Sequence, residues 1–212
     1  MTTLLQSARR RVRRRLRRRH VGKAYDMALE VARVVPRHAR VLDVGCGSGF
    51  IAHHLSALLG TKVVGLDVME RTSAPIEYLR YDGTHFPVPD ASFDAVLLCY
   101  VLHHAQDFRA VLDEVRRVLR DDGLVVVYED IPRGLWDRLI CWTHDLRWRR
   151  RTGRCVFRLT PEWRRLFAAF GFEIITERPL SRWRNIGHPV CRWFYVLRSN
   201  GAEKFQRLLS TG

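Results

Sequence analysis

The sequence predicts one α/β domain built on a largely parallel sheet, and three observations support this fold class. Its 212 residues are enough for a single domain with a full hydrophobic core. Short β-branched runs alternate with longer segments whose apolar residues recur every three or four positions, the pattern of strands followed by helices. A glycine-rich turn at residues 45–49 joins a strand directly to a helix, where glycine supplies the backbone freedom that a sharp turn needs.

Composition places the chain among folded proteins, with 47% hydrophobic and 28% charged residues. The longest apolar run, residues 95–102, is far shorter than the roughly 18 residues that cross a bilayer, so no membrane-spanning segment is expected. Five widely spaced cysteines without a Cys-x-x-Cys pair argue against disulfides and a structural zinc site. We therefore expect a cytoplasmic protein with no bound metal. No apolar run follows the basic N-terminus, so a secretory signal is not expected either.

The net charge of +15 is unevenly distributed along the chain. Residues 1–23 hold ten basic side chains and no acid, whereas residues 24–132 carry a net charge of −6. Apolar positions through residues 1–36 fit a basic amphipathic helix, which we treat as a separate segment before a domain at residues 37–212. Such a concentration of like charge indicates an anionic partner, with a membrane surface and RNA as the two candidates. A peripheral membrane location is therefore one expectation.

The elements follow one another with short connections. Strands are predicted at residues 40–44, 62–66, 77–81, 94–99, 124–129, 172–178 and 192–198. Helices are predicted at residues 50–59, at 108–119 with Gly123 just beyond, at 134–149, and from Thr160 onward. Only nine residues, including Pro75, separate Asp67 from the third strand, whereas parallel crossovers usually need a dozen or more. This shortened crossover should contain at most one helical turn.

The clearest chemical signal is the turn Asp43-Val-Gly-Cys-Gly-Ser-Gly49 followed by Asp67. Glycines let a ligand approach the backbone closely, and the helix that begins after them adds oriented N–H donors. Asp67 ends the second strand 18 residues beyond Gly49, where a carboxylate can accept hydrogen bonds from ribose hydroxyls. Phe50 replaces the small residue of a dinucleotide fingerprint, and a phosphate-binding Gly-Lys-Ser/Thr is also absent.

Four ordered elements carry a family resemblance: residues 43–49, Asp67, the pair Asp82-Gly83, and residues 93–104 with their sequel at 111–123. Over about residues 37–129 the chain resembles a class I S-adenosylmethionine-dependent methyltransferase, closest to the type 11 domain of quinone-biosynthesis enzymes. The resemblance implies a Rossmann-like sheet of seven mostly parallel strands with the last one antiparallel. It also implies S-adenosylmethionine as cofactor, bound by residues 37–130, and an acceptor bound by residues 131–212.

The resemblance assigns roles on the cofactor side. The glycine loop would line the methionine part while Asp43 acts on its amino group, Asp67 would hold the ribose, and Asp82 the adenine amine. The full predicted cofactor set is Asp43, Gly45, Cys46, Gly47, Gly49, Asp67, Val68, Asp82, Gly83 and Cys99. Asp43 as a loop cap and Asp82 as an Asx-turn are the structural alternatives. The short crossover departs from the family and leaves the usual adenine-covering helix in question.

Acceptor-side candidates are less specific. His103 and His104 are the predicted catalytic residues, because a neutral imidazole can take a proton from the acceptor, and a structural role at a helix entrance is the alternative. His144 is a second candidate base, and we disfavour Cys99 as a nucleophile. All six tryptophans lie after residue 130, where they either line an aromatic or lipid-like acceptor pocket or, for most of them, pack helices onto the sheet.

These observations predict an enzyme that transfers a methyl group to a small-molecule or lipid-like acceptor by in-line displacement. One alternative is an RNA methyltransferase that uses the basic segments, although residues 98–101 lack the Asn/Asp-Pro-Pro-Tyr/Phe motif of enzymes that methylate base amines. The other alternative is a non-catalytic scaffold that binds S-adenosylmethionine. The intact set of glycines and acids argues against the scaffold.

Overall fold

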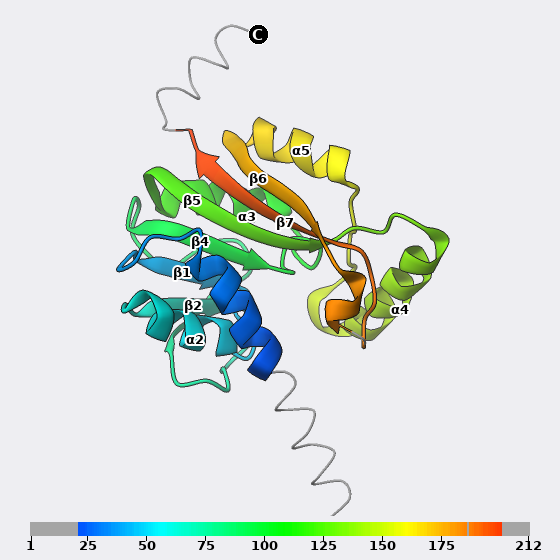
Figure 1. Ribbon diagram of the computed structural model, residues 1–212, viewed down its shortest axis with the longest axis horizontal. Helices are drawn as coiled ribbons and strands as arrows, with labels where there is room; N and C mark the ends of the chain where they lie inside the picture. Colours follow the sequence, from blue (N-terminus) through cyan, green and yellow to red (C-terminus); the bar gives the residue numbers. More distant parts are fainter. Residues whose placement is uncertain (1–20, 186, 201–212) are drawn as a thin grey trace, which may run out of the picture.

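A seven-stranded sheet forms the centre of the computed structural model, which describes residues 21–185 and 187–200 (Figure 1). Its strands are β1 (Val41–Val44), β2 (Val63–Asp67), β3 (Glu77–Arg80), β4 (Phe93–Cys99), β5 (Leu119–Asp130), β6 (Phe172–Leu180) and β7 (Arg192–Ser199). Their order is β3-β2-β1-β4-β5-β7-β6, with β7 antiparallel to both of its neighbours and every other pair parallel. The predicted fold class and strand arrangement are therefore confirmed.

Helices cover both faces of the sheet (Figure 1). The labelled helices are α2 (Phe50–Leu59), α3 (Phe108–Val118), α4 (Leu135–Thr152) and α5 (Thr160–Ala169), with a 3-10 turn η1 at Arg182–Asn185. Residues 21–32 form a further helix, which packs with α2 on one face, while α3 and α5 pack on the other. In contrast, α4 extends beyond the edge of this layered core and leaves space between itself and the strand ends (Figure 1).

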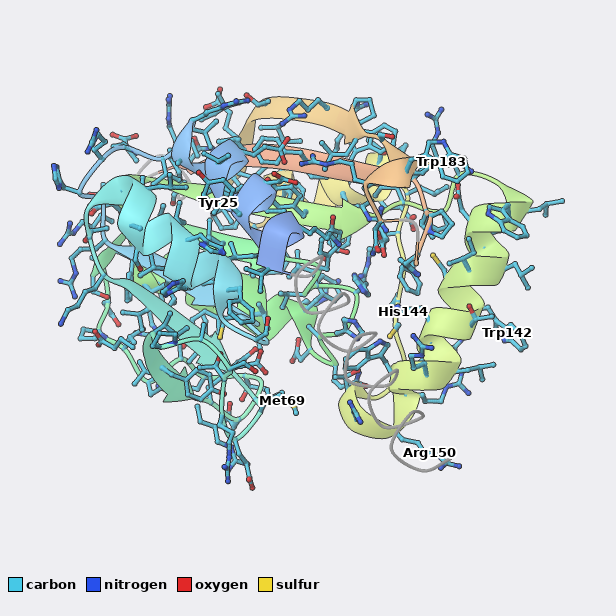
Figure 2. All side chains as sticks on the ribbon, turned by 60° about the horizontal axis from the view of Figure 1, so that its bottom comes forward. Tyr25, Met69, Trp142, His144, Arg150 and Trp183 are labelled. Carbon is cyan, nitrogen blue, oxygen red and sulfur yellow. The ribbon has the colours of Figure 1, made fainter. Side chains whose placement is uncertain are left out.

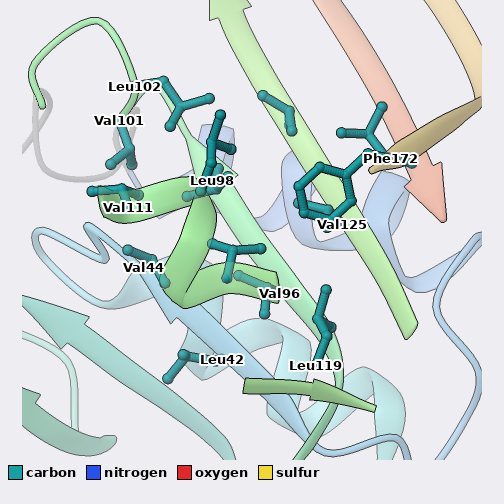
Figure 3. Packing of buried hydrophobic residues seen from close by; sticks show 14 of the residues in the cluster. Leu42, Val44, Val96, Leu98, Val101, Leu102, Val111, Leu119, Val125 and Phe172 are labelled. Carbon is teal, nitrogen blue, oxygen red and sulfur yellow. The ribbon is translucent and has the colours of Figure 1, made fainter. Parts of the chain in front are cut away.

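Alternation along β1 shows how the strands serve two cores. Val41 packs under the helix at 21–32 and α2, whereas Leu42 and Val44 point to the opposite face. Figure 3 shows Leu42 and Val44 in that second core, which also contains Leu98 of β4 and Val111 of α3, and Val44 lies near Val111. All five of these side chains are completely buried, as a parallel sheet covered on both faces requires.

Element boundaries agree closely with the sequence patterns, with one correction. The crossover at residues 68–76 contains no helix, as its length predicted. The expected extension of α3 to Leu119 is wrong, because Leu119 is extended and pairs with Phe93 at the start of β5. Gly123 consequently lies inside β5 rather than just beyond a helix end. No helix among the described residues combines the length and apolar character that crossing a bilayer demands.

The basic helix is predicted at residues 1–36, apart from the domain at 37–212; its residues 1–20 lie outside the described residues, and residues 21–32 form a helix that packs against the sheet. Ala28 and Val31 are completely buried against the sheet. Glu30 accepts hydrogen bonds from Tyr128 of β5 at 3.1 Å, Arg178 of β6 at 2.7 Å and Arg184 of η1 at 2.8 Å. One carboxylate therefore fastens this helix to three later elements.

We predict that Glu30→Ala lowers the free energy of unfolding by about 1–2 kcal/mol, because three donors lose an acceptor and two of them are partly exposed arginines. Burial raises the pKa of Glu30, but the two arginines more than offset this and hold it below the ordinary value. The stabilisation is thus fully present above the ordinary pKa of glutamate and disappears as pH falls through the lower, folded-state pKa. Urea unfolding at several pH values checks this, with Asp26→Ala on the same helix as an exposed control. Equal effects of the two substitutions would contradict it.

Candidate active site

The predicted cofactor residues meet at one edge of the sheet. They lie at or just beyond the carboxyl ends of β1, β2, β3 and β4, which are neighbours in the sheet. The chain crosses from β1 to β2 on one side and reaches β4 on the other, so β1 and β4 flank the point where strand order reverses. In open parallel sheets this reversal leaves a crevice at the carboxyl ends, where ligands bind.

The glycine loop after β1 forms a tight cradle. Gly45, Gly47 and Gly49 all adopt left-handed backbone conformations, with φ of 66°, 53° and 74°. A Cβ atom on Gly45 would lie 2.5 Å from a methyl carbon of Val101, whereas a Cβ on Gly47 would meet no atom within 4 Å. The loop is therefore packed against the chain at Gly45 and has open space beside Gly47. Cys46, buried between them, donates its N–H to the carbonyl of Leu66 at 3.1 Å.

Asp67 fixes this loop to the end of β2. Its Oδ2 accepts the N–H of Gly47 at 2.7 Å, and its Oδ1 accepts the N–H of Met69 at 3.1 Å. The residue is 7% exposed. Each carboxylate oxygen can accept more than one hydrogen bond, so the predicted contact with ribose remains available alongside these two.

Asp43 is the predicted cofactor residue whose buried side chain has no hydrogen-bond partner among the described residues. Among the described residues, neither of its carboxylate oxygens has a hydrogen-bond partner, and the residue is 1% exposed. Burial, reinforced by the negative charge of Asp67, raises the pKa of Asp43 to about 7. Buried polar groups in native proteins are normally paired, so this carboxylate is suited to a positively charged ligand group.

The ends of β2 and β3 lie side by side. Val68, which is 38% exposed, has a methyl carbon 3.7 Å from the position of a Cβ on Gly83. Asp82 is exposed, and its Oδ1 accepts the N–H groups of Thr84 at 2.7 Å and His85 at 2.8 Å. These hydrogen bonds lower the pKa of Asp82 to about 2. Asp82 Oδ1 thus makes the Asx-turn that was the structural alternative, whereas Asp82 Oδ2 takes no part in this turn.

A cleft of about 680 Å³ lies on the far side of the segment that follows β4. Its walls come from the helix at 21–32, the ends of β4 and β5, α4, and the connection from β6 to β7. The lining residues are Lys23, Tyr100, His103, His104, Asp130, Ile140, Thr143, His144, Arg147, Trp148, Asn185, Gly187, His188 and Arg192. Both predicted catalytic histidines therefore line the cleft, together with His144.

The segment Cys99–His104 connects the two regions. Burial raises the pKa of the Cys99 thiol well above its ordinary value, which leaves it protonated and agrees with our not assigning it as a nucleophile. Tyr100 has a left-handed backbone, with φ of 62°, a conformation that is costly outside glycine and clusters at functional sites. The side chain of Val101 packs against the glycine loop at Gly45, whereas His103 and His104 line the cleft.

The histidines differ in basicity. Burial lowers the pKa of His103, but Glu129, whose Oε2 lies 2.6 Å from its Nδ1, more than offsets this and leaves it raised. Burial and the neighbouring imidazoles lower the pKa of His104 to about 3 and that of His144 to about 4. Both of these rings are neutral at pH 7 and are weak proton acceptors.

Sequence patterns missed several cleft residues. Asp130 lies with one oxygen 2.8 Å from His188 Nε2 and the other 2.9 Å from Arg192 Nε. Lys23 reaches the cleft from the N-terminal helix, and burial followed by the charge of Arg192 lowers its pKa to about 8. The sequence held one sign of these cleft residues, the pair of acids Glu129 and Asp130 at the end of an apolar strand. The other cleft residues come from segments far apart in the sequence, so no local pattern joins them.

The expectation that most of the six tryptophans pack helices onto the sheet is wrong. Trp163 is completely buried, Trp193 packs against the core, and Trp148 lines the cleft. The other three, Trp136, Trp142 and Trp183, are 59%, 57% and 68% exposed. Packing therefore explains only a minority, and two of the exposed rings lie on α4.

Comparison with known proteins agrees with this geometry. A family described as "Methyltransferase domain" matches residues 42–127, the stretch from β1 to β5 that contains the glycine loop and Asp67. Over residues 42–127 the chain is thus similar to methyltransferase domains. This similarity agrees with the expectation that S-adenosylmethionine is the cofactor.

Two enzymes and one solved structure illustrate the similarity. A demethylmenaquinone methyltransferase of Thermus thermophilus is 34% identical over 122 residues, which cover 52% of this chain and 53% of the relative. A sterol 24-C-methyltransferase of Gibberella zeae is 33% identical over 111 residues, which cover 46% of this chain and 29% of the relative. The matched part thus spans about half or less of these relatives. The crystal structure of the cyclase SpnF shares the fold, with a TM-score of 0.67, 19% identity, and coverage of 83% of this chain and 81% of its own.

The residues at this edge of the sheet fit S-adenosylmethionine. Asp43 offers an unpaired buried carboxylate to the amino group, which is positively charged. The space beside Gly47 admits a ligand against the backbone, and Asp67 presents a carboxylate at the end of β2. The predicted cofactor set is therefore brought together at one edge, while its individual roles stay predictions.

We predict that Asp43→Asn stabilises the cofactor-free protein and abolishes cofactor binding. A carboxyl whose pKa rises from 3.8 to about 7 on folding loses stability as pH rises between those values, so removing its charge gains up to roughly 4 kcal/mol at pH 8. The gain should be smaller at pH 5. Urea unfolding at both pH values and calorimetry with S-adenosylmethionine check the two halves of the prediction. Asp113→Asn on the exposed side of α3 is the control, and a variant that is destabilised at pH 8 or still binds would refute it.

Proposed function

We propose that this protein is an enzyme that transfers a methyl group from S-adenosylmethionine to a small, lipid-like acceptor bound in the cleft. The observation that carries the proposal is the segment Cys99–His104, which has the glycine loop on one side and the cleft on the other. Val101 touches the loop, and two residues later His103 lines the cleft. A donor against the loop and an acceptor in the cleft would therefore meet across one short stretch of chain.

Positioning is the main requirement of this reaction. When bound, the cofactor supplies a methyl group on a positively charged sulfur. In-line displacement at such a carbon gains chiefly from proximity and orientation. The glycine loop and Asp67 orient the donor side, while Tyr100, held in its left-handed conformation, fixes the boundary between the two regions. A proton-accepting role for His103 and His104 stays a prediction.

The lining of the cleft indicates the kind of acceptor. Tyr100, Ile140 and Trp148 provide apolar surface, whereas Lys23 and Arg147 provide positive charge. The single acid of the lining, Asp130, already interacts with His188 and Arg192. The cleft therefore suits a molecule with an apolar body and an anionic or readily ionised oxygen.

Helix α4 supports a lipid-like acceptor, because four of its apolar residues form an exposed face on its outer side. Leu135, Leu139, Trp142 and Leu146 recur at helical spacing and are 84%, 50%, 57% and 47% exposed. The buried positions of the helix include Asp137 and Asp145. In Figure 2 His144 lies on the side of α4 toward the sheet, and Trp142 lies on the opposite side. We define Leu135, Leu139, Trp142 and Leu146 as the outer face of α4.

Basic residues border this outer face. A hollow of about 670 Å³ is lined by Trp142, Val156 and Leu159 together with three arginines. Those arginines are Arg138, Arg149 and Arg154. Exposed tryptophan and leucine beside arginine are typical of helices that lie in the surface of anionic membranes. We therefore propose that the outer face of α4 contacts such a membrane, which would place the cleft near a lipid-soluble acceptor.

The experiment that tests methyl transfer uses purified protein, S-adenosylmethionine with a deuterated methyl group, and a cell lipid extract. Mass spectrometry should find a product that carries the labelled methyl group. Asp67→Ala should weaken cofactor binding about 100-fold or more, since hydrogen bonds to a carboxylate contribute about 1.5–3 kcal/mol each and the variant also frees the Gly47 loop. Glu70→Ala, an exposed acid in the same crossover, should bind normally.

The other outcomes of this experiment identify the alternatives. Labelled RNA without labelled lipid would favour the RNA methyltransferase. Tight cofactor binding with no labelled product from lipid, RNA or the soluble extract would favour the scaffold. Failure to bind S-adenosylmethionine at all would refute the proposal.

Membrane contact is tested by flotation with vesicles of neutral lipid and with vesicles that also contain anionic lipid. Replacing Leu139 and Trp142 by serine should lower partitioning onto anionic vesicles by at least about tenfold, because each apolar side chain that leaves the interface costs roughly 1.5 kcal/mol or more. Trp183→Ser is the matched control, since this ring, at 68%, is more exposed than that of Trp142 but lies on η1. Equal effects of the two changes, or loss of self-association in the α4 variant without loss of vesicle binding, would overturn the assignment.

A further inference from the structure

The histidine cluster of the cleft has the composition and spacing of a metal site. His103 and His104 follow β4, and His144 comes from the facing side of α4. One ring nitrogen of each residue lies within 4.8 Å of the other two. In the part of the chain that the structure describes, this is the one group of three metal-ligating side chains with such spacing.

In His103 and in His104, the ring nitrogen Nδ1 already lies within hydrogen-bond distance of another side chain. His103 Nδ1 lies 2.6 Å from Glu129 Oε2, which leaves Nε2 buried and without a hydrogen-bond partner. His104 Nδ1 lies 3.1 Å from Thr152 Oγ1, which directs Nε2 toward His144. Histidines that bind metals almost always donate their other N–H to a carboxylate or similar acceptor, which fixes the tautomer and orients the ring.

We propose that His103, His104 and His144 bind one divalent ion of the zinc class. His104 Nε2 and His144 Nε2 are 3.1 Å apart. Two nitrogens at this separation, each about 2.0–2.1 Å from one ion, subtend roughly 100° at that ion, close to tetrahedral geometry. The third nitrogen lies within 4.8 Å of both and completes the set of three ligands.

The proposed site resembles catalytic rather than structural zinc sites in its ligand number. Three protein ligands leave a fourth position open, and all three histidines line the cleft, so this position faces the cleft. An oxygen of the molecule in the cleft can coordinate there. This last step rests on the proposed methyl transfer, whereas metal binding itself does not. It also gives the histidines a different role from proton acceptance, because a nitrogen bound to metal cannot take a proton.

Titration of the full chain, stripped of metal and free of cofactor, tests the site directly. Calorimetry with Zn²⁺ and visible absorption with Co²⁺ should show one ion per chain in tetrahedral coordination. His144→Gln should weaken zinc binding more than about 100-fold, and Glu129→Gln about 10–100-fold, because Glu129 orients a ligand without touching the metal. His188→Gln is the matched control, since His188 lines the same cleft, with its ring centred 4.9 Å from that of His144, but stands outside the cluster.

Saturable binding that depends on His144 but not on His188 would support the site. Absence of binding at one ion per chain, or equal loss in both variants, would overturn it. Should His144→Gln fail to fold, X-ray absorption of the zinc-loaded natural chain counts imidazole ligands without any substitution, and fewer than three would overturn it. Because neither cofactor nor acceptor is present, failure of methyl transfer would not affect this result, and failure of metal binding would leave methyl transfer standing.

Discussion

One buried carboxylate holds the active-site edge together. Glu129, at the end of β5, is completely buried and accepts the N–H of Leu102 at 2.9 Å through one oxygen and faces His103 Nδ1 at 2.6 Å through the other. A buried charge is tolerated only when it is well paired, and here both partners belong to the stretch that links the cofactor loop to the cleft. The geometry on either side of that stretch therefore depends on a residue that contacts neither ligand region directly.

Charge is segregated across the same stretch. The loop side carries the neighbouring carboxylates of Asp43 and Asp67, while the cleft side carries Lys23, Arg147 and Arg192. The acidic stretch at residues 24–132 thus supplies the carboxylates of the loop side, and its basic flanks supply the positive charge of the cleft side. A cationic donor and an anionic acceptor would each be attracted to its own side, which favours the pairing of unlike molecules over two of the same kind.

Sequence patterns correctly predicted the features that depend on neighbouring residues, such as helix ends and the glycine loop. Gly49 and Gly60 bound α2 as expected, and the spacing from the loop located Asp67 at the end of β2. The convergence of Lys23 and His144 could not be foreseen, because it depends on how helices distant in the sequence are docked. Periodicity shows that α4 is a helix but does not show which side is buried, and here the inward side carries acids that accept backbone N–H groups from nearby loops.

The helix-free crossover after β2 also bears on how quickly the proposed reaction could be repeated. Val68 and Met69 of this crossover are 38% and 49% exposed. With the nucleoside at this edge of the sheet, as predicted, departure of the demethylated donor would require breaking contacts at the loop and at Asp67 rather than displacing a packed helix. Exchange of spent for fresh donor would then depend on affinity alone.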